Sequence, residues 1–189
     1  MPRPIEFEVN PALDAAVEAF RHTGFGGTSI KALENATGLS SGSLYNSFGD
    51  KEAIFRLALA RYVDTVVSGR LTEHLAQQDP LAGLRDLFMT LLDEPGGGSY
   101  GCLLTNTAVE LGPGQSEALV DLRRGFQAQE DAFAAVLERL SPESGDARPA
   151  ARRLLALYQG VLVLIRCGYP KDRLAEMIAF EFDNLKGRL

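Results

Sequence analysis

Hydrophobic residues along the chain recur at intervals of three and four, while alternation with a period of two is almost absent. This spacing is typical of amphipathic helices. The first helix is predicted to begin at Asn10-Pro11, a pair suited to a cap and a first helical position, and to end at Gly24. Its apolar face comprises Leu13, Ala16, Val17 and Phe20.

Three further helices are predicted before residue 70 from polar start signals and terminating glycines. The signals occur in this order: Thr28 or Ser29, then Gly38; Ser40 or Ser41, then Gly49; and Asp50, which begins a long helix to about Ser68. Three short helices followed by a long one, with a glycine turn between the second and third, indicate a helix-turn-helix arrangement.

Five more helices are predicted in the rest of the chain, which makes the predicted fold all-α. A glycine-rich segment at 95–101 and a polar segment at 141–149 separate groups of them. We predict an N-terminal three-helix domain over residues 1–55, joined by the long helix to a second helical domain over residues 56–189. The first of these five helices begins at Pro80, and the other four span about 101–111, 115–140, 149–167 and 170–185.

The third predicted helix, SSGSLYNSF, is short and polar at its start, as a helix that enters the DNA major groove must be. Leu44 and Phe48 are its expected inward anchors. The side chains that remain for phosphate or base contacts are Ser41, Ser43, Tyr45, Asn46 and, in the next helix, Lys51. A serine at a helix start can equally be only a cap, and a tyrosine in a short helix can serve packing alone.

The segment GFGGTSIKALENATGLSSGSLYNSFGDKEAIF, residues 24–55, closely resembles the DNA-binding domain of the tetracycline repressor (TetR) family. Its small-residue turn, caps, Gly38-Leu39-Ser40 turn and Leu44-Tyr45-x-x-Phe48 core all occur in register. The resemblance implies a homodimeric regulator that binds a double-stranded DNA operator. By the same resemblance, phosphate or base contacts come from Thr28, Ser29, Ser43, Tyr45 and Lys51.

The charge of the chain opposes a broad nucleic-acid surface. The net charge is -6, and the residues up to Phe55 carry four basic side chains against seven acidic ones. The family often has a basic residue where Ser41 stands, and Arg3 is alone among Glu6 and Glu8 before the first helix. Each missing phosphate contact weakens binding and its salt dependence, so we expect modest affinity or strong dependence on dimerisation.

The second domain resembles the family's variable ligand-binding domain, which implies a small apolar or electrophilic ligand. Such apolar stripes are also typical of an ordinary core. The residues predicted to contact the ligand are Phe88, Leu91, Cys102, Leu103, Asn106 and Phe126.

Cys102 is predicted to lie at the start of a helix, beside the glycine-rich segment. A helix N-terminus favours the thiolate, the form of cysteine that reacts with electrophiles and oxidants. The Gly-Cys pair, with Glu110 two turns later, also resembles a TetR subgroup that includes oxidant- and electrophile-sensing repressors. The alternative is a buried, inert cysteine.

The last two predicted helices are apolar around much of their circumference, so each must bury more than one face. Pairing with a second copy of the chain gives a four-helix interface, the mode of dimerisation that the family resemblance implies. Burial within one chain is the alternative. The predicted interface residues are Leu157, Val161, Leu164, Ile165, Met177 and Phe180.

Other classes of protein receive little support. No apolar run reaches the roughly 20 residues of a membrane helix, and the start of the chain lacks a secretory h-region. Two cysteines make no disulfide framework, and neither histidine belongs to a cluster with metal-ligand spacing. We therefore expect a cytoplasmic protein that requires no metal or other cofactor.

These observations predict a DNA-binding transcriptional regulator, most simply a repressor, that a ligand or modification of Cys102 releases from its operator. An activator is not distinguished from a repressor. Two alternatives stay open: a helical ligand-binding protein without operator binding, and an enzyme that uses Cys102 as its nucleophile. The enzyme would need a base beside the cysteine, which neither His22 nor His74 suggests.

Overall fold

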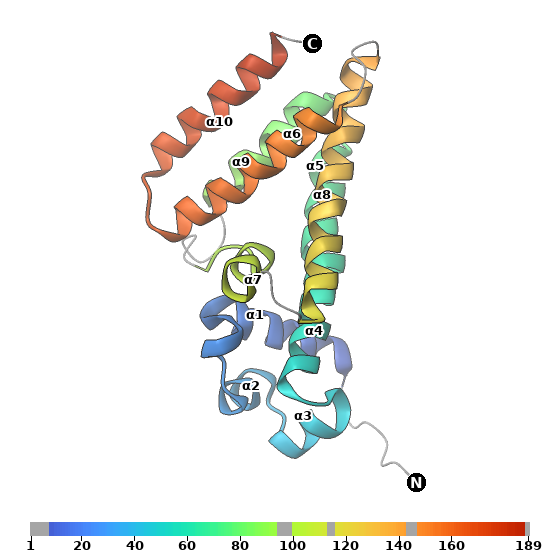
Figure 1. Ribbon diagram of the computed structural model, residues 1–189, viewed down its shortest axis with the longest axis vertical. Coiled ribbons are helices and arrows are strands. Elements are labelled where there is room, and N and C mark those ends of the chain that lie inside the picture. The colour runs from blue at the N-terminus through green and yellow to red at the C-terminus, as the bar shows by residue number, and fades with distance from the viewer. Residues whose placement is uncertain (1–7, 94–99, 113–115, 143–146, 188–189) are drawn as a thin grey trace. The chain divides into compact units, whose positions relative to one another are not determined.

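The computed structural model describes residues 8–93, 100–112, 116–142 and 147–187, and the regular secondary structure of these residues is entirely helical (Figure 1). The all-α prediction is therefore confirmed. In chain order the elements are α1 Val9–Gly27, α2 Ile30–Thr37, α3 Ser41–Phe48, α4 Lys51–Tyr62, the π-helix η1 Val63–Val67, α5 Ser68–Leu75, α6 Pro80–Met89, the 3₁₀ helix η2 Thr90–Asp93, α7 Leu103–Leu111, α8 Ala118–Leu140, α9 Arg148–Arg166 and α10 Lys171–Lys186.

The chain forms two compact units, each of which draws on two separate segments. Unit 1 comprises residues 1–66 and 102–124, and unit 2 comprises residues 67–101 and 125–189. Unit 1 thus contains α4 and α7 in addition to the first three helices. The division by function after residue 55 stays a prediction, because compactness alone does not assign a function to either part.

Polar side chains begin α2, α3 and α4 of unit 1 at the predicted places. The hydroxyl of Ser29 accepts a hydrogen bond from Ala32 N at 3.1 Å. Ser40 Oγ accepts from Ser43 N at 3.2 Å, so Ser40 rather than Ser41 is the cap of α3. The carboxylate of Asp50 accepts from Ala53 N at 2.8 Å. Each such cap stabilises its helix by about 1 kcal/mol.

A second carboxylate supports the start of α3 from the neighbouring helix. Glu34 on α2 accepts a hydrogen bond from Ser41 N at 2.7 Å and pairs with Lys31 at 3.2 Å. The Ser41 N–H donor, followed by Lys31, lowers the pKa of the Glu34 carboxyl below its ordinary value. This contact fixes the angle at which α3 leaves α2.

The core of unit 1 packs α1 against α4. The Phe20 and Phe55 rings meet edge to face with centroids 4.9 Å apart, an arrangement that adds about 0.5–1.5 kcal/mol to the burial of the rings. At the edge of this core, Arg61 on α4 makes a bidentate pair with Asp14 on α1, at 2.5 and 2.8 Å. The predicted inward anchors of α3 are confirmed, since Leu44 and Phe48 are both buried.

The predicted long helix from Asp50 to about Ser68 is interrupted. Regular α-helix ends at Tyr62, and the π-helical turns of η1 precede α5. Four of the five residues in the η1 segment VDTVV are β-branched, a type that crowds the preceding turn of an α-helix. Hydrophobic spacing could not reveal this change of hydrogen bonding, because Val63 and Val67 are both buried as an α-helical pattern would also require. The division between the two units falls within η1.

The core of unit 2 is an aromatic cluster to which four helices each contribute one ring. Phe88 of α6 is fully buried at its centre. Its ring meets Tyr158 of α9 and Phe182 of α10 edge to face, at 5.1 and 5.2 Å, and lies 5.7 Å from Phe133 of α8. These contacts hold α6, α8, α9 and α10 together.

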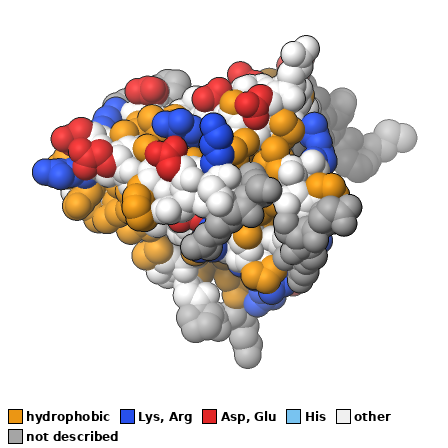
Figure 2. Space-filling view, turned by 90° about the horizontal axis from the view of Figure 1, so that it is seen from above, with side chains coloured by type: hydrophobic (Ala, Val, Ile, Leu, Met, Phe, Trp, Pro, Cys, Tyr) orange, Lys and Arg blue, Asp and Glu red, His pale blue; other side chains and the backbone are white. Residues whose placement is uncertain are grey.

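Ion pairs cover part of the surface of unit 2. Arg152 of α9 pairs with Glu130 of α8 at 3.1 Å, and Arg153 pairs with Glu181 of α10 at 2.7 Å. Exposed pairs of this kind contribute about 0–1 kcal/mol each. On the face seen in Figure 2, basic and acidic side chains lie side by side, with hydrophobic side chains exposed between them.

The two predicted loops lie partly outside the described residues, which omit 94–99 and 143–146. The helix predicted from Gly101 begins at Leu103, with Cys102 as its cap residue. Among the described helices, none combines the length and apolar character needed to cross a membrane.

The carboxylate of Glu34 generates a prediction about acid stability. Glu34→Gln is expected to lower the free energy of unfolding at neutral pH and to have little effect in acid. Because the folded state lowers the pKa of Glu34 from 4.5, its charge stabilises the fold above that value, and this contribution disappears as the pH falls through the lowered pKa. Urea unfolding of both proteins across this pH range measures the difference. Glu73→Gln, at an exposed position on α5, is the control. A deficit independent of pH would contradict the assignment.

Candidate nucleic-acid interface

The outer face of α3 presents the two side chains predicted to reach furthest toward DNA. Tyr45 is 47% exposed, and Asn46 is also exposed. Both project from a helix whose opposite side is anchored by Leu44 and Phe48. The helix therefore offers a short polar surface on a rigid support.

The start of α3 brings several hydroxyl groups together. Ser40 and Ser43 lie within hydrogen-bonding distance of each other, with their oxygens 3.1 Å apart. Ser41 is half-buried, and its backbone N–H is already bonded to Glu34. Ser29 is exposed at the start of α2. Ser40, which the sequence assigned only to capping, is thus an additional exposed hydroxyl at this surface.

Lys51, in the first turn of α4, lies against an aromatic ring. Its ammonium nitrogen is 4.5 Å from the centroid of the Phe25 ring, within cation–π range. The Phe25 ring in turn packs against Phe55 of the core, with centroids 5.0 Å apart. The position of the lysine charge is therefore set by Phe25, a residue that the sequence did not single out.

Thr28 requires a correction to the predicted DNA contacts. Its side chain is 0% exposed, and its hydroxyl donates to the carbonyl oxygen of Gly24 at 2.6 Å. The same hydroxyl lies 2.7 Å from that of Thr23. Thr28 stabilises the turn between α1 and α2 from within, so its side chain is not available to a phosphate in this conformation.

Cys102 caps α7 and is 7% exposed. The Tyr62 hydroxyl donates a hydrogen bond to its sulfur at 3.3 Å. Tyr62 is itself buried, and the guanidinium of Arg21 lies 5.9 Å from the centroid of its ring. The thiol therefore lies at a packed contact between α4 and α7 inside unit 1.

The residues predicted to contact a ligand divide between the two units. Leu103 and Asn106 lie with Cys102 in unit 1, and the Asn106 amide donates to the Arg21 carbonyl oxygen at 3.4 Å. Phe88, Leu91 and Phe126 belong to unit 2. Phe88 and Leu91 are buried, and Phe126 is partly exposed. A ligand role for these six residues stays a prediction.

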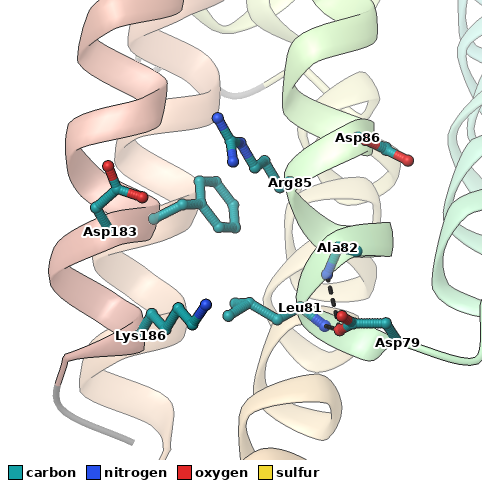
Figure 3. A pocket seen from close by; sticks show the side chains of 8 residues that line it. Asp79, Leu81, Ala82, Arg85, Asp86, Asp183 and Lys186 are labelled. Atoms are coloured by element: carbon teal, nitrogen blue, oxygen red, sulfur yellow. Dashed lines mark hydrogen bonds between the residues drawn. The ribbon is translucent and has the colours of Figure 1, made fainter.

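Unit 2 has an open pocket of about 340 Å³ between α6 and α10. Its lining includes Leu81 and Arg85 of α6 and Asp183 and Lys186 of α10 (Figure 3). Acidic and basic groups line it together, and it includes none of the six predicted ligand residues.

The predicted dimer residues on α9 and α10 differ in exposure. Phe180 is 70% exposed, whereas Val161 is 0% exposed and is explained by packing within the chain. The remaining four, Leu157, Leu164, Ile165 and Met177, are partly exposed. Cys167 is exposed at the end of α9.

Within the described part of the chain, no three histidine, cysteine or acidic residues come together in a way that could hold a metal ion. His22 belongs to unit 1 and His74 to unit 2.

Comparison with known proteins agrees with this architecture. The sequence profile described as "Bacterial regulatory proteins, tetR family" matches residues 12–58, which span α1 to most of α4. The HTH-type transcriptional repressor ComR of Escherichia coli (strain K12) is 27% identical over 93% of this chain and 87% of its own length. The uncharacterised HTH-type regulator YezE of Bacillus subtilis (strain 168) is also 27% identical, over 94% of this chain and 96% of its own.

A solved structure extends the similarity to both units. It contains a cysteine mutant of the TetR family transcriptional regulator CifR complexed with 26-bp double-strand operator DNA. It has 25% sequence identity and a TM-score of 0.80, and the match covers 96% of this chain and 98% of that one. The profile match to residues 12–58, the two relatives and this structure together support a transcriptional regulator of the TetR family.

Proposed function

We propose that this TetR-family regulator is a repressor that binds a double-stranded DNA operator as a homodimer through the exposed residues of α2, α3 and the first turn of α4. The observation that carries the proposal is the outer face of α3, where Tyr45 and Asn46 are exposed, together with the Lys51 charge in the first turn of the next helix. The family is one of regulators, so an enzymatic role for Cys102 is set aside. A regulator of bacterial DNA acts in the cytoplasm, where the chromosome lies.

The contacts divide into two chemical kinds. The Lys51 ammonium and the hydroxyls of Ser29 and Ser43 suit phosphate oxygens, which fix the position of a protein on DNA. Tyr45 and Asn46, further along α3, are placed to reach base edges, where sequence is read. Ser40 joins the first group, Ser41 stays a candidate, and Thr28 is left out because it is buried. With Lys51 as the central cation, the proposal predicts modest affinity for one protomer.

Repression is favoured over activation by the relatives. ComR is named a repressor, and CifR was solved with its operator DNA. A repressor needs no contact with the transcription machinery, because occupation of the operator is sufficient.

Dimerisation follows from the geometry of operator recognition. Two helix-turn-helix units related by a two-fold axis read half-sites one helical turn, or a multiple of it, apart. The partly exposed apolar residues of α9, together with Phe180 and Met177 of α10, supply a surface for a second copy. In such a dimer the second copy would cover the exposed ring of Phe180.

Release is proposed to occur through α7. Cys102 is packed against Tyr62, so an adduct on its sulfur cannot be accommodated without displacing the first turn of α7. With an α,β-unsaturated carbonyl compound, the sulfur bonds to the β-carbon and the α-carbon takes up a proton. A small apolar ligand that binds better to the displaced state would have the same effect on DNA binding.

Replacement of Lys51 tests the interface. Lys51→Met is expected to weaken binding to a duplex that the protein enriches from a random-sequence pool. It should also make the slope of log K against log salt shallower by about 1.8, because each protomer of the dimer loses one phosphate contact. The matched control is Lys171→Met, an exposed lysine at the start of α10 in unit 2. Enrichment of no sequence would contradict operator binding, and an unchanged slope would remove Lys51 from the interface.

The dimer surface is tested by charge. Phe180→Glu is expected to shift the protein from dimer to monomer in sedimentation equilibrium, because a carboxylate would have to be buried in the interface. Val120→Glu, at a valine that is 65% exposed on α8, is the control. A dimer that Phe180→Glu leaves intact at the same protein concentration would place the interface elsewhere.

Cys102 is tested in a Cys167→Ser background, in which it is the remaining thiol. Treatment of the folded protein with an α,β-unsaturated carbonyl compound should give one adduct by intact-mass measurement and release the enriched duplex. The Cys102→Ser variant should keep the duplex under the same treatment. A thiol that stays unmodified in the folded protein, or an adduct that leaves DNA binding unchanged, would exclude release by modification.

A further inference from the structure

The carboxylate of Glu110, near the end of α7, contacts the last turn of α1, which follows the break in that helix at Gly24. Its two oxygens accept hydrogen bonds from consecutive backbone groups: Oε2 from Phe25 N at 2.8 Å and Oε1 from Gly26 N at 2.5 Å. We propose that Glu110 is a positioning residue for DNA binding, which fixes the Lys51 charge by holding Phe25. This inference rests on the proposed function, because it concerns how the same interface is set.

The backbone is shaped for this contact. At Gly24 the chain leaves the helical conformation, with φ 76° and ψ 178°, so the N–H groups just after it begin a new turn without acceptors from a preceding one. A Cβ atom at position 24 would lie 2.7 Å from Glu110 Oε2. Glycine thus permits both the unusual dihedral angles and the close approach of the carboxylate.

By holding the backbone of Phe25, Glu110 also positions the ring of that residue. The ring lies between Phe55 of the core and the Lys51 ammonium, at centroid distances of 5.0 and 4.5 Å. If the turn moves, the ring loses its defined place over Phe55, and the lysine loses the surface that orients it. Glu110 therefore acts on Lys51 without contacting it.

The position of Glu110 on α7 also connects this contact to Cys102, the residue at which release is proposed to begin. Cys102 caps the first turn of α7, and Glu110 lies in the last, about 12 Å away along the axis at 1.5 Å per residue. Asn106, between them, bonds to the Arg21 carbonyl of α1. A short rigid helix transmits a shift from one end to the other, and a hydrogen bond weakens once its donor and acceptor are more than about 3.2 Å apart. Displacement at Cys102 would thereby weaken the Glu110 hydrogen bonds that hold Phe25, and with them the support of the Lys51 ammonium by the Phe25 ring.

A double-mutant cycle on the enriched duplex tests the inference. Glu110→Gln keeps the size of the side chain but replaces one acceptor oxygen with a donor, so it is expected to weaken binding about tenfold, a change of about 1.4 kcal/mol. In the Lys51→Met background, the same substitution should weaken binding less than about twofold, because the charge that it positions is already absent. Glu73→Gln is the matched control outside unit 1 and should leave binding unchanged.

The outcomes separate this inference from the proposed function. If wild-type protein enriches no duplex, operator binding itself fails. If Lys51→Met weakens binding but Glu110→Gln does not, or if Glu110→Gln costs the same tenfold in both backgrounds, positioning through Lys51 is wrong. Amide hydrogen exchange at Phe25 and Gly26 should rise in Glu110→Gln, and unchanged protection would contradict the hydrogen bonds themselves. Should Glu110→Gln fail to fold, Glu110→Asp, which keeps the charge at a shorter reach, carries the same comparisons.

Discussion

The N–H groups that a short helix leaves unpaired at its start are the constraint on which unit 1 depends. The first four N–H groups of any α-helix lack an intrahelical acceptor, so in an eight-residue helix such as α2 or α3 they amount to half of the backbone donors. Unit 1 supplies acceptors from side chains at the starts of α2, α3 and α4: hydroxyls from Ser29 and Ser40, and carboxylates from Asp50 and Glu34. Glu110 does the same for the broken end of α1.

This constraint also accounts for part of the acidic charge of the proposed DNA-binding unit. Two of the carboxylates that dominate its charge, Glu34 and Asp50, lie at helix starts, where the partial positive charge of the helix dipole offsets them. Asp14 is paired with Arg61. These acids stabilise the position of α3 and α4, so their count overstates the repulsion that a phosphate backbone would meet at Tyr45 or Lys51. A net charge describes the whole chain and does not describe one face of a helix.

Local signals in the sequence were sufficient for most of the fold. Caps and terminating glycines act within three or four residues, and Ser29, Ser40, Asp50 and Gly38 have the predicted roles for that reason. The failures have different physical origins. Thr28 looked like an exposed cap because its hydroxyl can serve either a phosphate or the backbone, and only tertiary burial decides between them. The π turns of η1 share the apolar pattern of an α-helix, so periodicity could not distinguish the two.

Contacts between distant segments were beyond the sequence altogether. No spacing rule connects Glu110 to Phe25, and the aromatic support of Lys51 depends on how α1 meets α4. The pairing of Gly24 with Glu110 has an evolutionary consequence. A side chain gained at position 24 would expel the carboxylate, and loss of the carboxylate would leave two backbone donors without their acceptor. Whether a substitution at one of these positions is tolerated therefore depends on the residue at the other, so the two positions are expected to change together.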